Sequence, residues 1–339
     1  MRRKTAVLLT LVMILSTFTA CGRGDSADIP KEAPDVILVT SESGLGDLGL
    51  NDSCWEGCSR AAEKWDLSVY CIESESAEDY AAKITEAVGM EPQLILCAGE
   101  DMQDALMSIA EAYPEQKFAI IDKNGLGENV TGITFQEQDG AFLAGIAAGM
   151  VTESRIVSFI GGQQSILQDC FQYGFTSGVR TVASDVYVNT QYVGDSSDAA
   201  AAKMLAGAHE ALGSDVIYQT AGEAGSGIAE TAAAKGIFVI GTDLTLYSEA
   251  EDAVLCAIVR KADVAVYDVI RKLKEGTLDG ADVVYTLSDG AFEICDKEGN
   301  LPEEVRKKME DYTEKIAAGN LSVPYDWQTC HDYVSQLQH

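Results

Sequence analysis

The stretch Leu94-Ile95-Leu96-Cys97-Ala98-Gly99-Glu100 decides the fold class. Four consecutive apolar residues are followed by a small residue, a glycine and an acid, and residues 101–113 then have helical spacing. A short apolar run without polar alternation is typical of a strand buried on both faces, as in a parallel sheet covered by helices. The next apolar run, residues 118–121, predicts a strand–helix–strand unit. The segment therefore predicts an α/β fold.

The same rhythm extends in both directions along the chain. Further strands are predicted at residues 36–40, 67–72, 130–135, 156–160, 186–193, 216–219, 237–240, 254–259 and 283–287. Helical spacing also occurs at residues 53–64, 77–88, 139–150, 199–212 and 262–274. So many strands exceed what one open sheet of this kind holds comfortably, and we therefore expect two α/β lobes with parallel sheets.

The most natural break between the lobes falls at residues 151–155, after the predicted helix at 139–150. We assign residues 35–152 to lobe 1, with residues 254–277 returning to it. Residues 153–253 are assigned to lobe 2, with residues 278–295 returning to it. Residues 296–339 are expected to form a C-terminal helical segment.

The first 21 residues indicate where the protein works. Three basic residues, Arg2 to Lys4, precede an apolar run at 6–18 that is too short to cross a bilayer, which predicts a signal peptide over residues 1–20. The junction Phe18-Thr19-Ala20-Cys21 resembles the bacterial lipobox, which implies that Cys21 is lipidated and anchors the protein on the extracytoplasmic face of the cell membrane. The polar residues 21–34 would then be a tether. The alternative is an ordinary secreted protein.

The charge of the chain excludes one class of partner. The formal net charge is −30 at pH 7. Such an acidic chain is expected to avoid nucleic acid and anionic lipid headgroups, since both are polyanions. No second apolar stretch approaches the length of a membrane span, so the lipid would be the only anchor.

Cysteines and histidines give little sign of a metal site. Cys54 and Cys58 are spaced i, i+4 on a predicted helix, but the histidines, His209, His331 and His339, lie far from them in sequence. Scattered cysteines in apolar runs behave as small buried hydrophobic residues. We expect neither a metal nor a cofactor.

Polar and glycine residues follow several predicted strands. Glu100, Gly222, Asp243 and Arg260 each come at or after such an end. In parallel α/β sheets ligands bind beyond the carboxyl ends of the strands. Asp243 suits bidentate bonding to vicinal hydroxyls, although it could instead cap its loop, and Gly222 lets a ligand approach the backbone. The turn after Gly222 has no Gly-Lys-Ser/Thr sequence and is therefore not a phosphate loop.

The segment 51–53 is predicted to begin a helix. Glu56 stands three residues after Ser53, as a capping box requires. A helix N-terminus is also a natural place for polar ligand groups. Capping alone and ligand binding both remain open for Asn51 and Ser53.

Eight blocks of sequence together resemble the basic membrane protein (BMP) lipoproteins, the PnrA-like purine-nucleoside binders. They are residues 44–57 (GLGDLGLNDSCWEG), 118–122, 133–145, 159–162, 171–175, 192–194, 219–222 and 263–268. The resemblance implies a type I periplasmic binding fold, with two Rossmann-like lobes, a hinge and a ligand between the lobes. It also implies an ABC permease and ATPase as partners.

The resemblance further implies a set of ligand-binding residues. Asp47, Asn51, Asp122, Gly222 and Asp243 match the family, and Arg260 stands where the family tends to have a sugar-contacting lysine.

Three positions depart from the pattern. The resemblance implies two aromatic rings that sandwich the purine and an acid that contacts it, and this chain has Leu50, Ser196 and Ser41 there. The base-specifying groups are therefore missing. Glu100 and Tyr218 complete the candidate set, and other rings that could take over the stacking are Trp55, Tyr173, Tyr192 and Tyr247.

We therefore predict a substrate-binding lipoprotein of an ABC importer that binds a small polar ligand, with a nucleoside as the default. Alternatives are the same fold binding a sugar or another small ligand as a surface sensor, and an extracellular nucleoside hydrolase. Catalysis is disfavoured because no histidine lies between residues 21 and 208 and no tight group of aspartates ends a strand.

Overall fold

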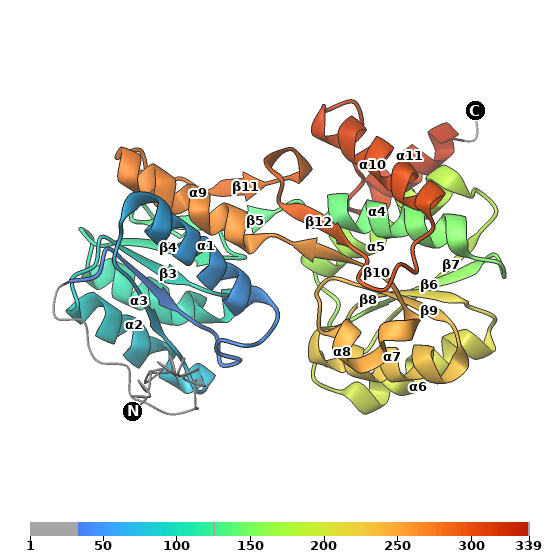
Figure 1. Cartoon of the computed structure of the whole chain (residues 1–339), viewed down its shortest axis with the longest axis horizontal. Coiled ribbons are helices and arrows are strands. Elements are labelled where there is room, and N and C mark those ends of the chain that lie inside the picture. The colour runs from blue at the N-terminus through green and yellow to red at the C-terminus, as the bar shows by residue number, and fades with distance from the viewer. Residues whose placement is uncertain (1–32, 125, 338–339) are drawn as a thin grey trace, which may run out of the picture. The chain divides into compact units, whose positions relative to one another are not determined.

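Two six-stranded sheets form the framework of the protein in the computed structural model, which describes residues 33–124 and 126–337 (Figure 1). The predicted signal peptide and Cys21 lie outside these residues. The first sheet has the order β11 (Val283–Tyr285), β5 (Val130–Phe135), β4 (Lys117–Ile121), β3 (Leu94–Cys97), β1 (Val36–Val39) and β2 (Val69–Ile72). All its neighbouring strands are parallel.

The second sheet has the order β12 (Phe292–Cys295), β10 (Val254–Arg260), β9 (Phe238–Gly241), β8 (Val216–Thr220), β6 (Ile156–Gly161) and β7 (Tyr187–Tyr192). Its strands are parallel except β12, which runs antiparallel to β10. The predicted α/β fold with two parallel-sheet lobes is confirmed. The strand β12 is not among the strands predicted from the sequence.

Helices cover both faces of each sheet, which explains why the strands are continuous apolar runs. On the first sheet, α1 (Leu50–Trp65) and α9 (Ala262–Glu275) share one core, and α2 (Tyr80–Gly89) and α3 (Gln103–Ala112) share the other. On the second sheet, one core contains α4 (Glu137–Val151), α5 (Ile166–Val182), α10 (Glu303–Ala317) and α11 (Trp327–Leu337). The opposite core contains α6 (Ala199–Ala211), α7 (Gly225–Lys235) and α8 (Leu246–Ala250).

Helix α4 belongs to the second lobe, which corrects the lobe break expected at residues 151–155. The chain leaves the first sheet after β5, and α4 then packs closely on α5. Glycines on both helices allow this approach: a Cβ at Gly145 would lie 2.1 Å from the Phe175 carbonyl oxygen, and one at Gly178 would lie 2.1 Å from that of Phe142. Helical spacing alone does not say which sheet an almost wholly apolar helix covers.

Two later strands also exchange lobes relative to the sequence-based assignment. Residues 254–260, expected in lobe 1, form β10 in the second sheet, and residues 283–285, expected in lobe 2, form β11 in the first. The chain therefore crosses between the lobes at residues 136, 261 and 286–291. Strand pairing is a long-range choice, and an apolar run fits either sheet equally well.

The cysteines within the described residues are free thiols, and most of them are buried. Burial raises the pKa of Cys97 to about 12, so this thiol stays protonated and unreactive at neutral pH. Residues 33–124 and 126–337 contain no group of three or more His, Cys, Asp or Glu side chains placed to hold a metal ion. Within the same residues, no helix combines the length and apolar character needed to cross a bilayer.

Candidate ligand-binding site

A cavity of about 560 Å³ lies where the two sheets present the carboxyl ends of their strands. The first lobe contributes the beginning of α1 and Asp122, which follows β4. The second lobe contributes Leu167 and Phe171 of α5 and the residues at the ends of β8, β9 and β10. This volume is within the range of small-molecule sites, and the position is where parallel α/β sheets bind ligands.

Five of the candidate residues line the cavity: Leu50, Asp122, Gly222, Asp243 and Arg260. Gly222 and Asp243, which follow β8 and β9, and Arg260, which ends β10, were expected from strand ends, whereas Asp122, after β4, was expected only from the family resemblance. Gly222 has a φ of +62°, a left-handed conformation that favours glycine and lets the turn after β8 run along the wall of the cavity.

Arg260 joins both lobes within the cavity. Its Nη1 atom lies 2.7 Å from Oδ1 of Asp122, at the end of β4, and 2.9 Å from Oε1 of Glu137, at the start of α4. About a fifth of the side-chain surface of Arg260 and of Asp122 is exposed, and Glu137 is buried. The guanidinium charge is therefore already balanced by two carboxylates before any ligand enters.

Burial and pairing act in opposite directions on the pKa values of Glu137 and Arg260. Burial raises the pKa of Glu137, and the charge of Arg260 opposes only part of that rise. For Arg260, burial lowers the pKa, but the charges of Asp122 and Glu137 outweigh it and the net shift is upward. The Nε and Nη2 groups of Arg260 have no hydrogen-bond acceptor among the described residues. They remain available as donors to a neutral acceptor on a ligand.

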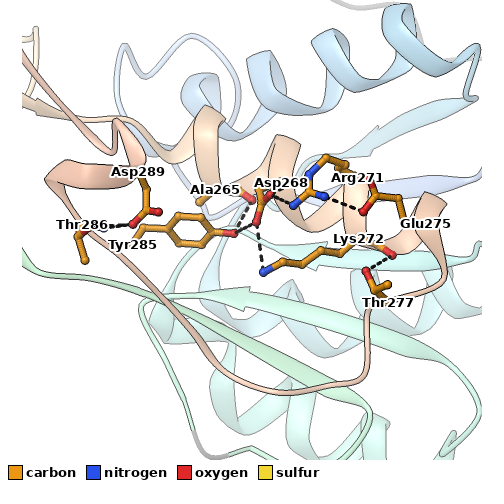
Figure 2. Close-up of polar contacts among 9 residues, drawn as sticks. All are labelled: Ala265, Asp268, Arg271, Lys272, Glu275, Thr277, Tyr285, Thr286 and Asp289. Carbon is orange, nitrogen blue, oxygen red and sulfur yellow. Dashed lines mark hydrogen bonds and ion pairs between the residues drawn. The ribbon is translucent and has the colours of Figure 1, made fainter. Parts of the chain in front are cut away.

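Arg260 packs against an aromatic ring whose neighbour is held by hydrogen bonds and ion pairs. The guanidinium carbon lies 4.9 Å from the centroid of the Phe135 ring, and that ring is 5.9 Å from the ring of Tyr285. Figure 2 shows how Tyr285 is held: its hydroxyl donates to Asp268 at 2.9 Å, and Asp268 also pairs with Arg271 and Lys272. The orientation of Arg260 thus depends on strands β5 and β11 and on helix α9.

Asp243 uses one carboxylate oxygen locally and keeps the other available. Its Oδ1 atom accepts hydrogen bonds from the backbone N–H of Thr245, at 2.9 Å, and from the Thr245 hydroxyl. No described residue donates a hydrogen bond to Oδ2. Oδ1 can therefore cap the loop while Oδ2 accepts hydrogen bonds from a ligand.

Asp47 organises the start of α1 next to the cavity. Its carboxylate accepts from the backbone N–H groups of Gly49, Asn51 and Asp52 at 2.9–3.1 Å. The Asn51 side chain is buried and donates to Asp47 and to Ser41 at 3.0 and 2.9 Å. These three candidates, Asp47, Asn51 and Ser41, support the cavity wall and do not line the cavity.

The capping box expected at Ser53 and Glu56 is wrong. Helix α1 begins at Leu50 and its N-cap residue is Gly49, so Ser53 lies inside the helix. The Ser53 hydroxyl instead accepts from the backbone N–H of Asp263 at 3.0 Å. The loop carboxylate of Asp47 caps the first turn, and local spacing could not reveal a cap that comes from outside the motif.

Three candidates lie away from the cavity. Glu100 pairs with Lys123 at 2.7 Å near the surface. Ser196 lies beside Gly222, where its carbonyl oxygen accepts from Ala224, but it does not line the cavity. Tyr218 is 1% exposed and stacks on Phe175 with centroids 5.2 Å apart, because its side chain points to the face of β8 covered by α4 and α5.

Sequence reasoning missed several lining residues. Glu137 and Phe171 are the most informative, and Leu167, Lys261 and Glu293 also line the cavity. Leu167 and Phe171 are spaced i, i+4, so they lie on one face of α5, which is the only signal that could have paired them. The rings proposed as replacements, Trp55, Tyr173, Tyr192 and Tyr247, do not line the cavity.

The lining is acidic overall. The cavity is lined by six acidic residues and two basic ones, Arg260 and Lys261. The Nζ atom of Lys261 lies 3.3 Å from Oε2 of Glu293. A ligand that carries phosphate would meet net negative charge and no unpaired cation among the described lining residues. The electrostatics therefore favour a neutral or cationic ligand.

Comparisons with known proteins agree with this architecture. A sequence profile of the family described as "ABC transporter substrate-binding protein PnrA-like" matches residues 35–326. The chain is 29% identical to the CD4+ T-cell-stimulating antigen of Listeria innocua, over 95% of this chain and 99% of that protein. It is also 29% identical to the ABC transporter nucleoside-binding protein BmpA of Lactococcus lactis, over 94% of this chain and 97% of that protein. A solved ABC transporter solute-binding protein from Aeropyrum pernix matches with a TM-score of 0.71 at 26% identity and covers 90% of this chain and 98% of that one.

Proposed function

Because the chain belongs to the PnrA-like family of ABC transporter substrate-binding proteins, we propose that it delivers a ribonucleoside, bound in the cavity between its lobes, to an ABC importer. The resemblance read from the sequence blocks is thereby confirmed at the level of the family. The observation that supports the ligand most is the convergence of Asp243 and the Asp122–Arg260–Glu137 triad on one cavity.

The chemistry of these groups suits a ribose. The free oxygen of Asp243 can accept from a hydroxyl, and the unpaired N–H groups of Arg260 can donate to one. The acidic lining argues against a phosphorylated ligand. The Lactococcus relative, which is described as nucleoside-binding, adds support for the same ligand class.

The proposal includes the location and the partners. Cys21 would carry the lipid that holds the protein at the extracytoplasmic face of the membrane, and a permease and ATPase would receive the ligand. Members of the family are substrate-binding proteins, and we propose no catalytic activity for this chain.

Thermal denaturation of the protein without its signal peptide and Cys21 tests the ligand class. A ligand that binds only the folded state raises the melting temperature by an amount that grows with its concentration relative to Kd. We expect adenosine, inosine, cytidine and uridine to raise it, and their 5′-monophosphates to have little effect. If arabinose or galactose stabilises the protein and no nucleoside does, the ligand is a sugar and the nucleoside proposal fails.

A further inference from the structure

We propose that Phe171 is the ring platform of this cavity, so that the base of a bound nucleoside packs between Phe171 of the second lobe and Leu50 of the first. This rests on the proposed function, since it assigns the site for the base once a nucleoside is the ligand. Among the described residues that line the cavity, Phe171 is the one aromatic side chain.

Phe171 has the surroundings of a fixed platform. It is partly buried, packs against the core of the second lobe and also lines the cavity. A ring that already rests on a core loses little freedom when a ligand covers its open side. Leu167, one turn earlier on α5, lines the cavity beside it and is 40% exposed.

Hydrogen bonds fix the beginning of α5 to the end of β8. The Gln168 side chain donates to the carbonyl oxygen of Thr220 at 3.0 Å and accepts from its hydroxyl at 2.6 Å. Ser165 caps the helix by accepting from the Gln168 backbone N–H at 3.2 Å. Thr220 itself lines the cavity, so the face of α5 that carries Leu167 and Phe171 is held against the site.

The first lobe supplies an aliphatic counterpart. Leu50 is partly buried, packs against the first-lobe core and lines the cavity. Leu48 lies next to it, 55% exposed, with a φ of +51°, a conformation that leucine rarely adopts. The Asp52 carboxylate holds this strained turn by accepting from the N–H groups of Gly46 and Leu48 at 2.7 and 3.0 Å.

One aromatic ring opposite aliphatic side chains gives contact area with little selectivity. Every base has a π face that can stack on Phe171, whereas Leu50 adds apolar contact without a preferred ring orientation. We therefore expect purine and pyrimidine nucleosides to bind with Kd values within about tenfold of each other.

Isothermal titration of adenosine and uridine into four proteins tests the platform. Phe171→Ala should weaken both nucleosides by roughly 5- to 150-fold, the range for removing a stacked ring. Phe171→Leu, which keeps most of the apolar volume and protects folding, should weaken them by roughly 2- to 10-fold. Ile166→Ala is the matched control, because Ile166 is on the same helix, 86% exposed and outside the cavity lining. It should leave Kd unchanged.

A gain of function gives a second readout. Leu50→Phe would place a second ring at the cavity wall and should strengthen adenosine more than uridine, since the purine offers more stacking area. If both Phe171 variants bind nucleosides as tightly as the wild type, the platform proposal is overturned while the nucleoside function stands. If neither adenosine nor uridine binds the wild type, the proposed function fails first and the base site fails with it.

Discussion

Single residues set the charge that the cavity presents. Arg260 is shared by two carboxylates, and Glu137 is buried enough for its pKa to rise despite that pairing. A buried charge loses more when its partner is removed than the pair contributes as a whole, because the remaining charge is left uncompensated.

Arg260→Gln should therefore destabilise the ligand-free protein by about 2–3 kcal/mol at pH 7.5. This is below the ~3–5 kcal/mol of a fully buried pair, because Arg260 and Asp122 keep about a fifth of their surface exposed. Lys123→Gln, which breaks an exposed pair with Glu100, is the matched control and should cost less than about 1 kcal/mol. Urea unfolding measures both. Equal losses in the two variants would show that the triad is not energetically special.

Asp139 predicts a pH dependence. It is 2% exposed, and burial raises its pKa to about 6, although a hydrogen bond from the Leu287 backbone opposes the rise. The folded state therefore holds a proton that the unfolded chain releases, and stability falls as pH rises from about 4 to about 6. Asp139→Asn removes this titration.

The Asp139→Asn variant should gain about 2–3 kcal/mol relative to the wild type between pH 4 and pH 7, since one pKa unit corresponds to about 1.4 kcal/mol. Urea unfolding at pH 4, 5.5 and 7 gives the difference directly, and effects of the overall charge cancel in the comparison. A difference that does not change with pH would mean that Asp139 titrates normally.

At the scale of single residues, the sequence predicts a site residue only where a local sequence pattern marks its position. Gly222, Asp243 and Arg260 could be found because strand ends are visible as sequence patterns, and Asp122 was found through the family resemblance. Phe171 and Glu137 could not, because they reach the cavity from helices whose facing sheet is not encoded locally. The cap that Asp47 provides for α1 was also missed, because its carboxylate comes from a loop outside the capping motif.

Elements are placed by close packing that spacing alone does not reveal. The alternation of strands and helices predicts an α/β fold, but α4, β10 and β11 lie in lobes other than those expected. Glycines on α4 and α5 explain why α4 lies in the second lobe. At these glycines the two helix backbones come so close that a Cβ atom would not fit.

Gly178→Ala should disrupt this packing. Its Cβ would lie 2.1 Å from the Phe142 carbonyl oxygen, so one helix must shift, and we expect a loss of about 2–4 kcal/mol. Gly207→Ala, within α6, has nothing within 4 Å of its Cβ and should instead stabilise by about 0.5–1 kcal/mol. Thermal unfolding distinguishes the two, and a neutral Gly178→Ala would contradict the tight α4–α5 contact.

At the scale of the whole molecule, three chain crossings join the lobes and Arg260 bridges them inside the cavity. Ligand contacts to both lobes would favour a closed arrangement over an open one, as in hinge closure. Small-angle scattering with saturating adenosine should therefore show a smaller radius of gyration than without it. An unchanged radius for a nucleoside that binds would argue against closure.

The most direct test of a ribonucleoside site is isothermal titration of adenosine into the wild type and Asp243→Ala. We expect 1:1 binding by the wild type and a loss of about 1.5–3 kcal/mol in the variant, the range for a hydrogen bond to a charged group. The 2′-deoxy and 3′-deoxy analogues should bind the wild type more weakly than adenosine does. Binding that is unchanged in Asp243→Ala and in both analogues, or no binding of adenosine at all, would contradict the site.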